Sequence, residues 1–335
     1  MDVRLSRRSY SSAATLPALF AVAVACTAGS ALAQPAAWPS KPVRIVVGFV
    51  PGGATDTIGR TVAQQLGERF GRAVVVENRA GASGTIAAEF VARAPADGYT
   101  MIMATQTTHA VVPYMMPKLP YDPIRDFTPV VIAAQNTLLV VVTPSMPVKS
   151  IKDLVALART RPGELSFATG GVGSSPHMAG ELFARIAKVQ MTPVFYKGDA
   201  AAVVDVIGGR VPIMFLNITN MIQHIRGGKL RGLAVTAGKR SAILPEFPTV
   251  AEGGLTGFDV VTWFGLLAPA GTPADVVSRI NRDTNQALAV LAVREQMATL
   301  GIEPVGGSAE QFAALLKEEN ARWSRMVSDL RLRTD

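Results

Sequence analysis

Cysteine is almost absent from this sequence, because Cys26 is the only one among 335 residues. It lies in an N-terminal segment with the features of a secretory signal: a basic start, an apolar run from Ala13 to Cys26, and an Ala-Leu-Ala box that ends at Ala33. We therefore predict a cleavable signal peptide over residues 1–33 and a periplasmic location for the processed chain. That chain has no cysteine, which excludes a disulfide framework, a cysteine nucleophile and a cysteine metal site.

The export route has more than one interpretation. The pair Arg7-Arg8 loosely matches a twin-arginine signal, and the residues before Cys26 loosely match a lipoprotein cleavage box. Both matches are imperfect, since Ser11 stands where an apolar residue usually follows the arginines, and Ala23 replaces the usual leucine of the box. We expect export by the Sec route, with the twin-arginine route as the open alternative.

Long apolar runs, aromatic residues and histidines are also scarce. No segment after residue 33 is long and apolar enough to cross a membrane. Aromatic residues make up 6% of the chain and the basic residues are dispersed, which argues against a nucleic-acid-binding surface. The three histidines, His109, His177 and His224, are far apart and fit no metal-ligand spacing, and no phosphate-loop motif occurs, so we expect neither a metal nor a cofactor.

What the sequence does contain is a repeated alternation of β-branched runs with amphipathic stretches, which predicts an α/β fold with largely parallel sheets. Ile58, Val62, Leu66 and Phe70 recur every four residues and predict the buried face of one helix. The net charge of +8, of which the predicted signal carries +2, favours an anionic solute through long-range attraction.

The chain is longer than one compact core usually supports, so two domains are expected. Between Leu138 and Val142 the strand pattern resets, and a capping box at Ser150 begins a new helix. If the chain later returns to its first domain, it crosses between the two lobes at least twice. Such connections are typical of two lobes that close on each other about a hinge. We predict that residues 34–140 form the first part of lobe 1, residues 141–258 form lobe 2, and residues 259–335 return to lobe 1.

Glycine-rich and polar loops follow the predicted strands of the first lobe. Gly52 and Gly53 lie between a strand and a helix whose N-terminal N–H groups would suit a carboxylate. Loops after successive parallel strands converge on one edge of a sheet, which supports a binding role, while the alternative that Asp56 and the threonines only cap turns stays open. The predicted ligand-binding residues of this lobe are Phe49, Pro51, Gly52, Gly53, Asp56, Ser83, Thr105, Gln106 and Thr108.

The second lobe offers a comparable set. A glycine-rich loop leads into a helix whose first residue we predict to be Pro176. The loop lacks the third glycine of a dinucleotide-binding fingerprint and the Gly-x-Ser-x-Gly of a hydrolase, so a hydrolase that uses Ser174 or Ser175 with His177 is the weaker alternative. The predicted ligand-binding residues of this lobe are Gly173, Ser174, Ser175, His177, Tyr196, Lys197, Gly198 and Asn217.

A series of short motifs runs in order along the whole chain after the signal. They include Pro51-Gly52-Gly53 with Asp56, Asp97-Gly98-Tyr99-Thr100, Tyr121-Asp122-Pro123, Tyr196-Lys197-Gly198 and Gly208-Gly209-Arg210-Val211. Taken together, these segments resemble the solute receptors of the tripartite tricarboxylate transporters, also known as the Bordetella uptake (Bug) proteins. This chain departs from the pattern of that family at Asp199, where a small residue is common after Tyr-Lys-Gly. A carboxylate at this position would disfavour an additional carboxylate on the ligand.

The resemblance implies a two-lobed periplasmic binding protein of the Venus-flytrap kind, type II-like, with the ligand cleft between its lobes. It implies that the protein is no enzyme, captures a small carboxylate solute and delivers it to a membrane permease with a large and a small subunit. We expect a monomer. A sensory co-receptor for a membrane kinase would have the same fold and site, so that alternative stays open.

Overall fold

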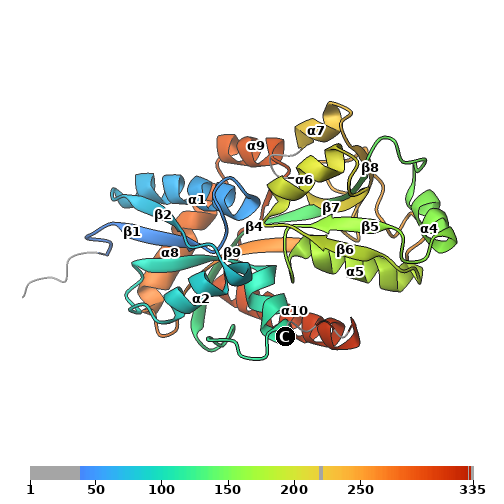
Figure 1. Ribbon diagram of the computed structural model, residues 1–335. Helices are drawn as coiled ribbons and strands as arrows, with labels where there is room; N and C mark the ends of the chain where they lie inside the picture. The colour runs from blue at the N-terminus through green and yellow to red at the C-terminus, as the bar shows by residue number, and fades with distance from the viewer. Residues whose placement is uncertain (1–37, 219–221, 331, 333–335) are drawn as a thin grey trace, which may run out of the picture. The chain divides into compact units, whose positions relative to one another are not determined.

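A single long strand, β4 (Phe127–Val142), takes part in both lobes of this α/β fold (Figure 1). The computed structural model describes residues 38–218, 222–330 and 332, so the predicted signal peptide lies outside the described residues. From Phe127 to Thr137, β4 pairs with β9 (Val261–Pro269), and from Leu138 onward it pairs with two strands of the second lobe. The two lobes are therefore joined through the backbone of β4.

The first lobe is built on the strand order β2-β1-β3-β9-β4. β1, β2 and β3 are parallel to one another in the sheet, whereas β9 is antiparallel to both β3 and β4. The loops that follow the three parallel strands consequently leave from the same edge. The remaining strands of this lobe are β1 (Val43–Val47), β2 (Val74–Asn78), β3 (Thr100–Thr105) and β10 (Glu303–Pro304). The short strand β10 pairs with β4.

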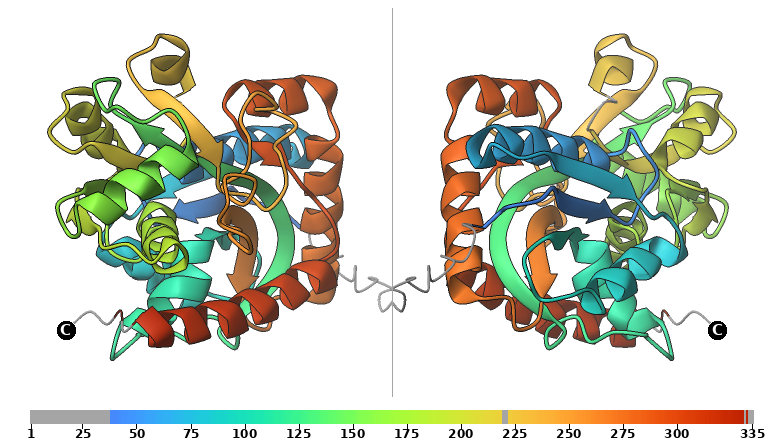
Figure 2. Two further views of the ribbon diagram at one scale, coloured as in Figure 1. Left: turned by 90° about the vertical axis from the view of Figure 1, so that its right-hand side faces the viewer. Right: turned by 90° about the vertical axis from the view of Figure 1, so that its left-hand side faces the viewer.

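Helices cover both faces of this sheet, with α1 and α10 on opposite sides (Figure 2). Ile58, Val62, Leu66 and Phe70 of α1 are all buried in the core that α1 shares with α8 and α9, which confirms the predicted helix face. The opposite core contains the apolar residues of α2 and α10. The helices are α1 (Ala54–Phe70), α2 (Thr85–Ala92), α3 (Val112–Met115), α8 (Ala274–Leu288), α9 (Leu291–Thr299) and α10 (Ala309–Leu330), with short turns η1 (Ala82–Gly84) and η2 (Thr107–Val111).

The second lobe is built on the order β4-β7-β5-β6, in which β5 is parallel to both β6 and β7. Helices α4 and α5 supply one of its cores, and α6 and α7 the other. The bounds are β5 (Ser166–Thr169), β6 (Thr192–Phe195), β7 (Ile213–Asn217), β8 (Arg231–Val235), α4 (Ile151–Thr160), α5 (Ser175–Ala187), α6 (Asp199–Ile207) and α7 (Ile222–Arg226).

The structure confirms one of two predicted helix starts and corrects the other. The hydroxyl of Ser150 accepts a hydrogen bond from the N–H of Asp153 at 3.2 Å, as the predicted cap requires. The prediction for Pro176 is wrong by one residue, because α5 begins at Ser175 after an N-cap at Ser174. Across the described ranges 38–218 and 222–330, the structure has no helix with the length and apolar character needed to cross a bilayer.

Candidate functional site

The loop between β1 and α1 is held in place by Asp56, which is buried in the first turn of α1. Its carboxylate accepts hydrogen bonds from the N–H of Gly52 and from Nδ2 of Asn78, both at 2.9 Å, and pairs with Arg60 at 3.0 Å. Burial opposes the negative charge, but these hydrogen bonds, that of Arg60 foremost, outweigh it and lower the pKa of Asp56. Asp56 is thus occupied by donors of the chain itself and fixes a turn in which Gly52 has a φ of +86°.

Gly84 brings three loops of the first lobe together. Its φ is +89°, and a Cβ there would lie 2.5 Å from Cγ2 of Thr108 and 3.4 Å from Cζ of Phe49. Only glycine fits at position 84, where these loops meet. Pro51 and Gly53 lie exposed at the tip of the loop between β1 and α1. The sequence prediction does not include Gly84, although its place in the glycine-rich loop after the second strand is a signal that points to it.

Thr105 and Thr108 close the turn after β3 by bonding to each other. The N–H of Thr105 donates to Oγ1 of Thr108 at 3.1 Å, and the N–H of Thr108 donates to Oγ1 of Thr105 at 3.3 Å. Oγ1 of Thr108 also lies 2.8 Å from Nδ1 of His109. All three side chains are buried, and burial lowers the pKa of His109 to about 3, so the imidazole is neutral.

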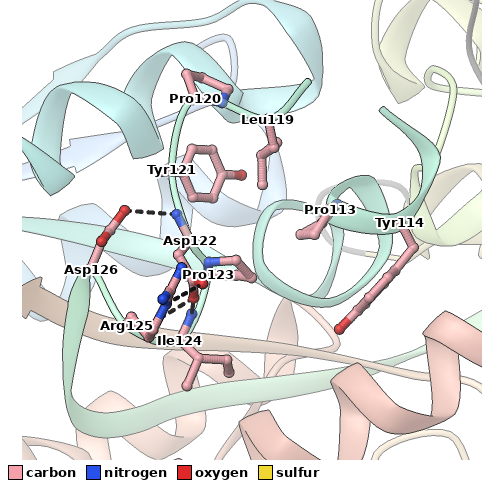
Figure 3. Close-up of a pocket in the computed structure, with 10 residues that line it drawn as sticks. All are labelled: Pro113, Tyr114, Leu119, Pro120, Tyr121, Asp122, Pro123, Ile124, Arg125 and Asp126. Carbon is pink, nitrogen blue, oxygen red and sulfur yellow. Dashed lines mark hydrogen bonds and ion pairs between the residues drawn. The ribbon is translucent and has the colours of Figure 1, made fainter. Parts of the chain in front are cut away.

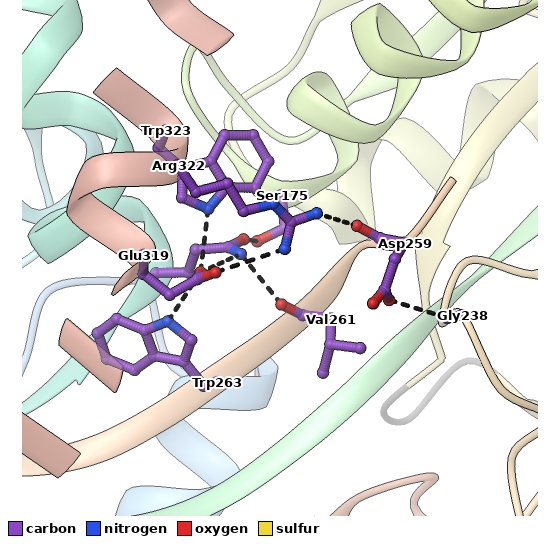
Figure 4. A network of polar contacts seen from close by, with 9 residues as sticks. Ser175, Gly238, Asp259, Val261, Trp263, Glu319, Arg322 and Trp323 are labelled. Atoms are coloured by element: carbon purple, nitrogen blue, oxygen red, sulfur yellow. Dashed lines mark hydrogen bonds and ion pairs between the residues drawn. The ribbon is translucent and has the colours of Figure 1, made fainter. Parts of the chain in front are cut away.

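Gln106 is fully buried and both ends of its amide are occupied. Nε2 donates to the carboxylate of Glu319 at 2.9 Å, and Oε1 accepts from the hydroxyl of Ser175 at 3.2 Å. Glu319 lies on α10 and also accepts from Nε1 of Trp263 at 3.2 Å and from Nε1 of Trp323 at 3.0 Å (Figure 4). Gln106 therefore connects the start of α5 in the second lobe with α10. The sequence prediction does not include Glu319, because no local motif marks this residue.

The start of α5 uses its polar groups internally. Oγ of Ser174 accepts from the N–H of His177 at 3.4 Å. Nδ1 of His177 accepts from the N–H of Gly173 at 3.1 Å, and its Nε2 lies 3.6 Å from the carboxylate of Glu181. The two ring nitrogens thus face groups other than the serine hydroxyls, so the geometry does not support a hydrolase that uses Ser174 or Ser175.

Three predicted residues lie in the loop between β6 and α6. The hydroxyl of Tyr196 donates to Oδ2 of Asp205 at 2.8 Å, which turns its polar end toward α6. Lys197 is exposed. Gly198 has a φ of +104° and is the N-cap of α6, so this loop ends, like the loops before α1 and α5, at a helix N-terminus.

Asn217, the last residue of β7, donates from Nδ2 to Oδ2 of Asp199 at 2.7 Å. Burial raises the pKa of Asp199, and the hydrogen bond from Asn217 partly opposes that rise. Asp199 keeps part of its surface accessible to solvent, so it lies deep in the protein without being sealed from water.

The loops of the two lobes meet. The hydroxyl of Ser83, in η1, donates to the carbonyl oxygen of Val172 at 2.9 Å. A Cβ on Gly198 would lie 3.9 Å from Cγ2 of Val50, which follows β1. The structure therefore brings together the polar loops that the sequence indicated in separate parts of the chain.

Two cavities open at the surface of the described residues. One has a volume of about 670 Å³ and is lined by residues 113–114 and 119–126 (Figure 3). The other has a volume of about 490 Å³ and is lined by residues 149–152, 232–233, 246–248 and 252–253. Neither is lined by a predicted ligand-binding residue. Among the residues that the structure describes, no cluster of His, Cys, Asp and Glu could hold a metal ion.

The chain matches the family model described as "Tripartite tricarboxylate transporter family receptor" over residues 58–332. A UPF0065 protein encoded in the tcbD-tcbE intergenic region of a Pseudomonas species is 43% identical, with 94% of each chain covered. Protein BugT of Bordetella pertussis is 36% identical, with 87% of this chain and 90% of BugT covered.

Solved structures are similar over most of their length. The structure of R. palustris Rpa4515 with adipate has a TM-score of 0.83 and 38% identity, and the match covers 88% of this chain and 98% of that one. MatC from Rhodopseudomonas palustris with bound malate has a TM-score of 0.80 and 33% identity, with 86% and 99% covered. The similarity thus extends over both lobes.

Proposed function

We propose that this chain, which belongs to the tripartite tricarboxylate transporter receptor family, is a periplasmic receptor that binds a small carboxylate between its lobes and delivers it to a membrane transporter. The observation that carries the proposal is the meeting of loops from both lobes, through Ser83 with Val172 and through Val50 with Gly198. The presence of adipate and malate in two structurally similar proteins supports a carboxylate as the ligand class.

The chemistry of the loops suits an anion. The loops that start at Phe49, Gly170 and Tyr196 lead directly into the N-termini of α1, α5 and α6. The N–H groups of a first helical turn and the positive end of the helix dipole favour negative charge at such positions. Each charge-assisted hydrogen bond contributes about 1.5–3 kcal/mol, so a few are enough for micromolar binding, which corresponds to about 8 kcal/mol.

Binding would favour the arrangement in which the lobes meet, because loops of both lobes contribute to the site and a ligand stabilises the state that it contacts best. We propose that a membrane permease with a large and a small subunit then recognises the liganded arrangement. Uptake of radiolabelled ligand into vesicles that contain both subunits tests this step. Uptake that is independent of added receptor would contradict delivery.

A thermal-shift screen tests ligand capture. The purified protein is unfolded and refolded to remove any ligand already bound, and is then screened against mono-, di- and tricarboxylates, amino acids and aromatic acids. A ligand at 100 times its Kd adds about 2.7 kcal/mol, which raises the Tm visibly. No rise with any carboxylate would contradict the proposed function.

A matched pair of glycine variants shows whether binding uses the first loop. Gly52 and Gly271 have φ values of +86° and +82°, and a Cβ on either has nothing within 4 Å. Gly52→Ala and Gly271→Ala therefore introduce the same backbone strain without a clash. We expect both to lower the Tm slightly, and only Gly52→Ala to weaken carboxylate binding.

A further inference from the structure

Asp199 lies across the carboxyl ends of three strands of the second lobe. It follows β6, its Oδ2 accepts from Asn217 at the end of β7, and its Oδ1 lies so close to Gly170, after β5, that a Cβ there would be 2.2 Å away. β5 is parallel to both β6 and β7, so this is the edge at which open α/β sheets bind ligands. The adjacent Gly198 is also the residue that approaches Val50 of the first lobe.

Asp199 differs from the other inward-facing carboxylates in having no cationic partner. Asp56 pairs with Arg60, Asp283 with Arg279 and Arg282, and Glu319 with Arg322. Within the described part of the chain, no Lys, Arg or His forms an ion pair with Asp199, and its one hydrogen bond comes from the neutral amide of Asn217. Asp199 is the first residue of α6, so the helix dipole favours its negative charge, but no side chain of opposite charge lies beside this half-buried group.

We propose that Asp199 determines the selectivity of the site by accepting a hydrogen bond from an ammonium or hydroxyl group of the bound carboxylate. Oδ2 is oriented by Asn217, and Oδ1 receives the donor of the ligand. The preferred solutes are therefore amino or hydroxy carboxylates, and plain carboxylates of the same length bind more weakly. This inference rests on the proposed receptor function and names the class of ligand for that site.

An ammonium group on the ligand should raise the affinity more than a hydroxyl group, because it supplies the positive charge that the chain itself does not place beside Asp199. A further carboxylate on the ligand near Asp199 meets like charge instead. The same residue therefore both attracts a donor and excludes an additional acid group.

Isothermal titration calorimetry on refolded, ligand-free protein tests the inference with three sets of matched acids. The sets are succinate, malate and aspartate; glutarate, 2-hydroxyglutarate and glutamate; and adipate, 2-hydroxyadipate and 2-aminoadipate. We expect at least one donor-bearing acid to bind about tenfold or more tightly than the plain acid of its set. If only the amino acids bind more tightly than the plain acids, the group that bonds to Asp199 is an ammonium group. If the hydroxy acid also binds more tightly, a hydroxyl group is enough.

Asp199→Asn keeps the shape and a hydrogen-bonding partner for Asn217 but removes the charge. In this variant the preference for the donor-bearing acid should shrink to within about threefold, while the plain acid binds as well as before or better. Asp275→Asn makes the same change in the first turn of α8, where the side chain is exposed, and should leave every affinity unchanged.

The outcomes separate this inference from the function on which it rests. Equal affinities within every set for the native protein, or a preference that survives Asp199→Asn, would overturn the role of Asp199 and leave the receptor function standing. Failure of the native protein to bind any of the nine acids would overturn the preference assigned to Asp199, and failure to bind any member of the wider thermal-shift panel would overturn the receptor function as well.

Discussion

The hydroxyl of Ser83 donates a hydrogen bond of 2.9 Å to the carbonyl oxygen of Val172, a residue 89 positions later in the chain. Ser83 follows β2 in the first lobe, and Val172 follows β5 in the second. Ser83 has a φ of +54°, so the backbone is in an uncommon conformation where it makes this contact. The contact joins the two lobes at the loops to which we assign ligand binding.

Removal of this bond should weaken binding more than folding. A neutral hydrogen bond contributes about 0.5–1.5 kcal/mol, so Ser83→Ala should lower carboxylate affinity roughly two- to tenfold if the bond forms only when the lobes meet. Calorimetry measures the affinity. Ser308→Ala removes the N-terminal cap of α10 and serves as the control, which should lower the Tm and leave the affinity unchanged.

Gly84→Ala should be far more damaging than Gly71→Ala. Both residues have positive φ, which costs a non-glycine residue about 1–2 kcal/mol. Only at Gly84 would the new Cβ also meet a neighbour, Cγ2 of Thr108, at 2.5 Å, and such overpacking costs about 1–3 kcal/mol more. Urea unfolding followed by circular dichroism should show this difference, and equal losses would contradict the close packing of the loops.

Glu319→Gln should destabilise the protein by about 1–3 kcal/mol. One carboxylate oxygen of Glu319 accepts from Gln106, Trp263 and Trp323, and the other faces Arg322 at 3.5 Å. A glutamine loses the charge that strengthens these bonds and turns its NH2 group toward a guanidinium. Glu318→Gln, at the exposed neighbouring position, is the control and should leave the free energy of unfolding unchanged.

Asp199→Asn should raise the Tm of the ligand-free protein at neutral pH. Burial raises the pKa of Asp199 in the folded state, so folding favours the protonated form, and the stability from this group falls as pH rises through its folded pKa. The uncharged amide avoids that loss. The Tm difference between the variant and the native protein should therefore be largest near pH 7 and should narrow toward pH 4. A Tm of the variant below that of the native protein at pH 7 would contradict this prediction.

His109 should make the protein sensitive to acid. Its pKa is lowered by burial from 6.5 to about 3, so the stability it provides is complete above pH 6.5 and is lost as pH falls toward 3, by up to about 1.4 kcal/mol per pH unit. His109→Phe places an aromatic ring beside Tyr121 and Phe127 and should flatten the fall of the Tm between pH 6.5 and 4. The same flattening in His224→Asn, at a half-exposed position, would show that His109 is not the cause.

Local patterns in the sequence predicted what local forces control. The buried face of α1 follows from the spacing of Ile58, Val62, Leu66 and Phe70, because a helix brings every third or fourth residue to one side. The cap at Ser150 forms between residues three apart in the chain. Ordered motifs along the chain also indicated the receptor family, since they record strand ends and glycine turns.

The tertiary structure alone decided which polar side chains meet across long distances in the sequence. Asp56 meets Asn78 at the end of β2, and Gln106 meets Glu319 across 213 positions of sequence. Asp199, which follows β6, reaches Asn217 at the end of β7 even though β5 lies between these two strands in the sheet. Strand order and the register of β4 set these contacts. The spacing of nearby residues encodes neither of them, because the pairing of strands depends on the free energy of the whole packed chain.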